Sequence, residues 1–158
     1  MRPVALVLST LTTLLVLSFA AAAPAAQAGP RIDRGERSVI RAINRARASH
    51  GLRGLLAGHR LARAADAHSR HMLRADFFSH GAFSQRVRRY VRYRSIGETI
   101  AMTSRCSAGT VVRMWLNSPS HRAVLLSSRF RRVGVGRRLG RLGSSRACLV
   151  TADFASRR

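Results

Sequence analysis

The sequence predicts an α+β domain in which helices cover a small antiparallel sheet. Two observations predict this class. Apolar residues recur at the three- and four-residue spacing of helices up to about residue 93 and again in 107–117, whereas 96–102 and 131–155 alternate with the period of strands. The chain after position 28 has about 130 residues, the usual size of one domain. We therefore expect one domain over residues 36–155.

Residues 1–28 have the composition of a secretory signal peptide. A single charge at Arg2 precedes an apolar run from Val4 to Ala23, and small residues stand at Ala26 and Ala28, where signal peptidase cleaves. The alternative is an uncleaved membrane anchor, because the run approaches the roughly 20 residues that span a bilayer. We predict cleavage, followed by an N-terminal segment over 29–35, no membrane-spanning segment in the mature chain, and a short tail over 156–158.

The first half of the domain is predicted to be helical. Asp33 and Glu36 are spaced as a capping box ahead of one apolar face, and Gly51 is placed to end that helix. A second helix is expected over 59–74 with His68 on its inward stripe, so that His68 is a core residue. A third is expected over 84–93, with its arginines facing solvent.

The second half mixes strands with helices. Residues 96–102 alternate as a strand that places Glu98 among apolar neighbours. A helix over 107–117 is predicted to turn Val111, Met114 and Trp115 inward. Two strands over 131–139 and 146–155, joined by a turn over 140–145, close the domain.

A short helix is predicted to start at Ser118, whose hydroxyl can cap it, with Pro119 at the first helical position. His121 then lies in the first turn. The positive end of the helix dipole disfavours the protonated imidazole there, so we expect a neutral histidine. A neutral histidine can accept a proton or bind a metal.

The two cysteines, Cys106 and Cys148, lie in a chain destined for an oxidising compartment, which favours a disulfide between them. Two separately buried thiols are the alternative, because cysteine packs well as a small apolar residue.

The charge is strongly basic. The chain has a formal net charge of +23, with arginine as its basic residue throughout and no lysine. Such a charge invites anionic partners, namely an envelope lipid or an anionic wall polymer. Codon bias in a GC-rich genome explains arginine over lysine, yet it does not explain why the chain has only 6 acidic residues. Export argues against a specific nucleic-acid role.

Seven ordered segments resemble the CAP superfamily, also called SCP-like, whose members include cysteine-rich secretory proteins, venom antigens and class 1 pathogenesis-related proteins. They are INRARASHGL, LARAADAHSRHM, FFSH, GETIA, WLNSPSHRAVLL, RFRRVGVG and TADF. The resemblance extends from about Val39 to Phe154 and is strongest to exported bacterial members. It implies an α-β-α sandwich with a central cleft. It also implies that the protein is located in the extracellular or cell-envelope space.

The resemblance also implies the cleft residues. Many members carry four residues there, two histidines and two glutamates. His80 of FFSH, Glu98 of GET and His121 of SPSHR are similar to three of these four. The second glutamate falls on Ser118, Thr99 stands where the family usually has asparagine, and Val124 replaces an amide-bearing residue. These departures imply a less polar cleft.

His80, Glu98 and His121 together form a ligand set that can hold zinc with an open position for water. Three functions remain open at this point. The first is a secreted, monomeric binding module with a His/Glu cleft. The second is a metal-dependent hydrolase using these three candidate catalytic residues. The third is a cationic protein whose arginine surface binds envelope polyanions.

Overall fold

The computed structural model describes residues 32–156. The predicted signal peptide and most of the tail lie outside this range. Nine elements follow one another: α1 (Arg34–Ala48), β1 (Leu56–Ala57), α2 (His59–Arg74), α3 (Phe83–Arg88), β2 (Ile96–Thr103), α4 (Ala108–Asn117), α5 (Pro119–Leu125), β3 (Arg132–Leu142) and β4 (Ser145–Ala155). No helix within the described residues is long and apolar enough to cross a membrane.

The sheet has the order β1-β3-β4-β2. The long strands β2, β3 and β4 are antiparallel, as predicted. The sequence did not predict β1, a two-residue strand that runs parallel to the start of β3 and makes the sheet mixed. Two residues are too short to show a periodic pattern. The predicted turn over 140–145 is also tighter, because the hairpin strands continue to Leu142 and resume at Ser145.

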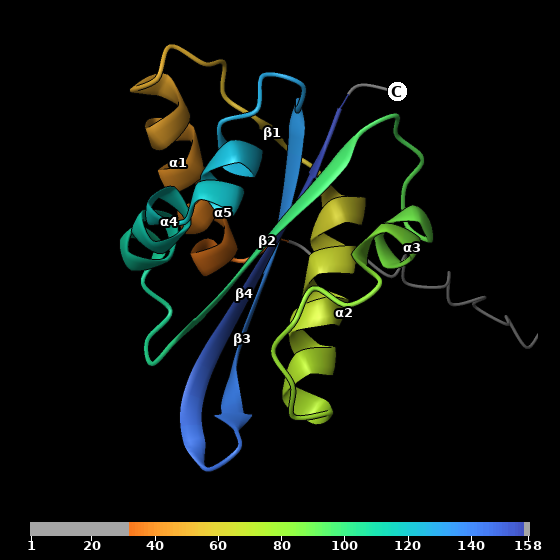
Figure 1. Ribbon diagram of the computed structural model, residues 1–158, viewed down its shortest axis with the longest axis vertical. Helices are drawn as coiled ribbons and strands as arrows, with labels where there is room; N and C mark the ends of the chain where they lie inside the picture. Colours follow the sequence, from red (N-terminus) through yellow and green to blue (C-terminus); the bar gives the residue numbers. More distant parts are fainter. Residues whose placement is uncertain (1–31, 157–158) are drawn as a thin grey trace, which may run out of the picture.

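Helices cover both faces of this sheet, as Figure 1 shows, with α1, α4 and α5 on one side and α2 and α3 on the other. The α+β class and the three-layer sandwich are confirmed. Because β4 lies between β3 and β2 and under both helical layers, its residues from Ala147 to Ala155 are all buried. The sequence of a strand that is covered on both faces is a nearly continuous apolar run.

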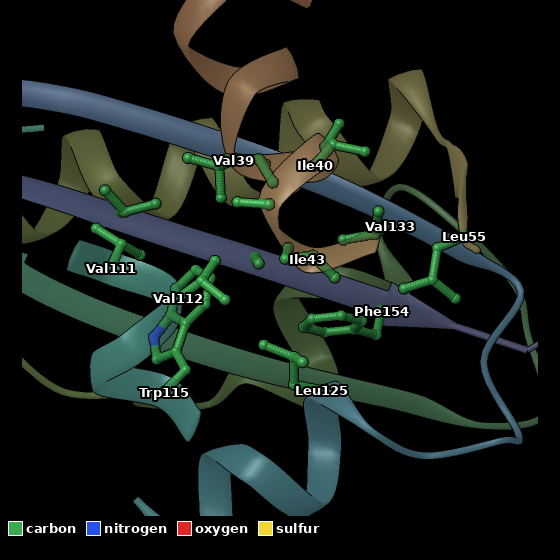
Figure 2. Packing of buried hydrophobic residues seen from close by; sticks show 14 of the residues in the cluster. Val39, Ile40, Ile43, Leu55, Val111, Val112, Trp115, Leu125, Val133 and Phe154 are labelled. Carbon is green, nitrogen blue, oxygen red and sulfur yellow. The ribbon is translucent and has the colours of Figure 1, made fainter. Parts of the chain in front are cut away.

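The larger core lies between α1, α4 and the sheet (Figure 2). Trp115 is 1% exposed, and its Nε1 donates a hydrogen bond to the carbonyl of Ile100 at 2.9 Å. Val111 and Trp115 point inward as predicted, but Met114 is 42% exposed and Val112 takes its place in the core. Val111, Val112 and Trp115 share the buried face of α4, and Met114 lies outside that face.

The cysteines form the predicted disulfide. Cys106 follows the end of β2, Cys148 lies in β4, and their Cα atoms are 5.4 Å apart. Thr103 on β2 is the register partner of Cys148. The bridge therefore ties the loop between β2 and α4 to the central strand.

Two glycines bring α2 directly onto the sheet. A Cβ at Gly134 would lie 2.0 Å from the backbone nitrogen of Ala62, and one at Gly136 would lie 2.1 Å from that of Asp66. The Gly-Val-Gly segment is thus a glycine-containing strand, as predicted, and its glycines permit close approach of a helix.

The third helix is shorter than the predicted 84–93, since it ends at Arg88. The segment carries several arginines and no carboxylate, so that like charges lie one helical turn apart at Arg88 and Arg92. Val87 and Val91 are buried, while Arg86 departs from the prediction by turning towards the sheet instead of solvent.

Candidate functional site

Glu98 is the centre of the site. It lies in the middle of β2, and its side chain is 1% exposed. One carboxylate oxygen accepts a hydrogen bond from Nδ1 of His80 at 2.8 Å, and the other accepts one from the guanidinium of Arg86. The carboxylate is therefore paired on both oxygens, which is how a buried charge is tolerated.

His80 lies in the loop between α2 and α3, and 44% of its side chain is exposed. Because a carboxylate accepts the bond, Nδ1 is the donor, and in the neutral tautomer with this proton Nε2 is an acceptor. Arg86 also donates to the carbonyl of His80 at 3.1 Å. Glu98 and Arg86 together fix both the loop and the tautomer of His80.

His121 lies in the first turn of α5 and faces His80, with ring centroids 5.7 Å apart. Burial lowers the pKa of His121, and the neighbouring His80 lowers it further. The imidazole is thus held towards its neutral form. The prediction that Ser118 caps this helix with its hydroxyl is wrong, because that hydroxyl lies 3.3 Å from the hydroxyl of Ser120 instead.

Arg47 holds the far end of α5 in place. It is 1% exposed and donates from Nη1 to the carbonyls of Leu125 at 2.7 Å and Ser127 at 3.0 Å. Its Nε donates to the carbonyl of Arg53. This buried side chain connects α1 to the helix that carries His121.

Two further residues of the site, Arg86 and Asp153, are not predicted from the sequence. The prediction places Arg86 in solvent, and it assigns no role to Asp153 within the alternating strand over 146–155. Asp153 is the register partner of Glu98, is 0% exposed, and has no hydrogen-bond partner for either carboxyl oxygen among the described residues. Burial raises its pKa well above the ordinary value, and the charge of Glu98 raises it further. The signal in the sequence that could have identified Asp153 is an acidic residue within a run of apolar strand residues.

The remaining histidines behave as predicted. His68 is 2% exposed, and its Nε2 donates to the carbonyl of Ser79 at 3.0 Å. Burial lowers the pKa of His68, and Arg86 lowers it further. His50, His59 and His71 are exposed. A hollow of 340 Å³ beside the site is lined by His68, Arg86 and Gly81 among others, and not by the imidazoles of His80 and His121.

The positions where the sequence departs from the pattern of the resemblance contribute no charge to the site. Ser118 supplies no second carboxylate, the hydroxyl of Thr99 is buried without a partner among the described residues, and Val124 packs against the core. No group of three or more histidine, cysteine, aspartate and glutamate side chains within residues 32–156 could hold a metal ion. The arrangement therefore offers two facing imidazoles, one of them oriented by a carboxylate.

Comparisons with known proteins agree with this architecture. The model of the cysteine-rich secretory protein family, CAP, matches residues 40–152. The YkwD protein of Bacillus subtilis is 30% identical over 107 residues, which cover 64% of this chain and 41% of that protein. The membrane protein YlbC of the same organism is 33% identical over 107 residues, 31% of its length. The chain thus spans less than half of either relative.

Among solved structures, the chain is similar to an extracellular protein with an SCP domain from Bacillus anthracis. The TM-score is 0.65 at 28% identity, over 78% of this chain and 40% of that one. The family match covers most of the described domain, and the fold accords with it. The chain belongs to the cysteine-rich secretory protein (CAP) family.

Proposed function

We propose that this protein is an exported binding module of the extracellular or cell-envelope space, and that it recognises its ligand with the His80–His121 pair. The observation that carries the proposal is the pair itself. Two imidazoles from different elements lie 5.7 Å apart, one oriented by Glu98 and the other held towards its neutral form by burial. Two such rings present ring nitrogens to one ligand.

Binding is favoured over hydrolysis by the state of the carboxylates. A general base must reach the proton that it removes. Both oxygens of Glu98 are occupied by His80 and Arg86, and Asp153 is fully buried. Neither group faces a substrate in this arrangement, so the alternative of a metal-dependent hydrolase has less support.

The same pair is the proposed place for zinc. His80 and His121 supply two imidazole ligands, and the Glu98–His80 hydrogen bond is the kind that orients a ligating histidine. A catalytic zinc centre uses three protein ligands, and the described residues bring no third. The pair fits a site that holds the ion together with donor atoms of the bound ligand, and it does not fit a preformed hydrolytic centre.

The proposed location rests on the signal-like residues 1–28, on the disulfide between Cys106 and Cys148, and on the extracellular relative from Bacillus anthracis. Disulfides persist in oxidising compartments.

The proposal is tested by binding of the purified protein to isolated bacterial envelopes at high salt, where interactions between exposed charges are screened. We expect saturable binding that the His80→Ala, His121→Ala double variant loses. The control is the double variant His50→Ala, His59→Ala. It removes two exposed histidines, one just after α1 and one at the first residue of α2. Binding that both double variants retain, or that is absent from the wild type, would contradict the proposal.

Calorimetric titration with zinc separates the metal from the ligand. We expect stoichiometric zinc binding that the His80→Ala, His121→Ala variant loses and the control retains. If envelope binding requires the histidine pair but the protein binds no zinc, the zinc proposal is wrong and the ligand-binding proposal stands. Zinc binding accompanied by zinc-dependent hydrolysis of envelope material would favour the hydrolase.

A further inference from the structure

A second concave surface surrounds the segment between α3 and β2. Its lining does not include His80 or His121, and it shares Arg89 and Tyr90 with the hollow of 340 Å³. It is an open hollow of 960 Å³, which we call the arginine hollow, and it has five arginines in its lining: Arg60, Arg88, Arg89, Arg92 and Arg94. Arg60 comes from the first turn of α2, and the others from the end of α3 and the segment after it. Tyr90 and Tyr93 line it as well.

The arginine hollow has no acidic counterpart. All 6 acidic residues of the chain stand elsewhere: Asp33, Glu36, Asp66, Asp76, Glu98 and Asp153. Five of them are engaged in caps, ion pairs or hydrogen bonds, such as Asp66 with Arg70 and Arg138, and Asp153 is buried. Their placement leaves the positive charge of the hollow unbalanced.

Within residues 32–156, none of the five guanidinium groups makes a hydrogen bond or an ion pair, and the hydroxyls of Tyr90 and Tyr93 make none either. This contrasts with Arg86, Arg137 and Arg138, which pair with carboxylates. Neighbouring positive charges repel one another. An anion that several of these arginines contact at once would therefore relieve the most repulsion. The guanidinium group matches phosphate with two parallel hydrogen bonds.

We propose that the arginine hollow binds phosphate groups of an anionic polymer. Arginines distributed along the six-residue segment from Arg89 to Arg94, with Arg60 opposite on α2, can contact successive phosphates of one chain. The tyrosine hydroxyls add neutral donors. Such binding depends on counterion release and weakens as salt rises.

A membrane surface fits this site less well than a polymer. The site is concave, and the large exposed apolar residues, which are Leu56, Phe78, Met102, Met114 and Leu139, do not line it. Peripheral membrane binding uses apolar side chains that enter the interface together with basic ones. A flexible polymer segment can enter a hollow that a flat bilayer cannot.

The test is titration of the purified protein with short-chain inorganic polyphosphate at low salt. The variant is Arg88→Gln, Arg92→Gln, Arg94→Gln. The control is Arg74→Gln, Arg105→Gln, Arg146→Gln, which removes the same charge at the far end of the molecule, at the end of α2, after β2 and at the start of β4. Circular dichroism checks that both variants fold.

We expect the hollow variant to raise the Kd at least about tenfold, because charge-assisted hydrogen bonds are lost, and the control to raise it far less. Equal weakening in both variants, or none in either, would overturn the proposal. So would equally tight, hollow-dependent binding of polyglutamate, which would make the site a general anion site. Hollow-dependent binding to phosphatidylglycerol vesicles without polyphosphate binding would replace the polymer with a membrane.

The substituted residues Arg88, Arg92 and Arg94 line the arginine hollow and do not line the hollow beside the histidine pair. The His80→Ala, His121→Ala variant is expected to bind polyphosphate as the wild type does, and the hollow variant is expected to keep the salt-resistant envelope binding. The two proposals can therefore fail separately.

Discussion

Glu98 on β2 and Asp153 on β4 lie directly opposite each other, with both carboxyl side chains withdrawn from solvent. Directly opposed like charges destabilise a strand pair. The chain avoids this cost because Arg86 and His80 pair with Glu98, while burial favours the protonated form of Asp153. Burial thus favours the protonated form of Asp153 beside the carboxylate that orients His80.

Replacing Asp153 with asparagine is expected to stabilise the protein at neutral pH. The pKa of Asp153 is higher in the folded state than the ordinary 3.8, so the folded protein binds more protons than the unfolded chain. The free energy of unfolding therefore falls as pH rises from about 3.8 through the folded pKa. Asp153→Asn removes this loss, and we expect a gain on the order of 2 kcal/mol at pH 7 that shrinks towards acid pH.

Urea unfolding of the wild type and Asp153→Asn across this pH range measures the effect. Asp66→Asn is the control, because Asp66 is paired with Arg70 and Arg138, and its loss should lower stability at pH 7. Parallel stability curves for the wild type and Asp153→Asn would mean that Asp153 does not titrate anomalously.

Gly136→Ala is expected to destabilise the fold by about 3 kcal/mol, the upper range for overpacking a core. The new Cβ would meet the backbone of α2 at Asp66, 2.1 Å away, and a backbone cannot swing aside as a side chain can. Thermal unfolding measures the loss.

Gly109→Ala is the matched control. A Cβ at Gly109 meets only the end of the flexible Arg113 side chain, at 3.4 Å, and Gly109 lies inside α4. Alanine should be neutral or stabilising there by up to about 1 kcal/mol. An equal loss in both variants would show that close approach at Gly136 is not the cause.

Removal of the disulfide by Cys106→Ala, Cys148→Ala is expected to lower the free energy of unfolding by about 4 kcal/mol, the chain-entropy value for a loop of this length. The two cysteines are 42 positions apart, and Cys148 is fully buried. Denaturant unfolding provides the measurement. The wild type in a reducing agent should lose a similar amount, and full stability under reduction would contradict the prediction.

Much of the fold could be predicted because its signals are local. The capping box of Asp33 and Glu36 is present, and the helix over 59–74 has the predicted bounds. The errors arose where a neighbour in space decides the outcome. The partner of Arg86, Glu98, is 12 positions away in sequence and on another element. The exposure of Met114 depends on which side of α4 packs into the core.

The sequence by itself determined the class of fold, the family resemblance and the identity of His80, Glu98 and His121 as candidate site residues, because periodicity and ordered motifs are properties of the chain. Only the tertiary structure decided what these residues do to one another. Strand register placed Asp153 opposite Glu98, the turn of Arg86 towards the sheet occupied the second oxygen of Glu98, and α5 brought His121 to face His80. Protonation and pairing depend on burial and distance, which exist once distant segments meet.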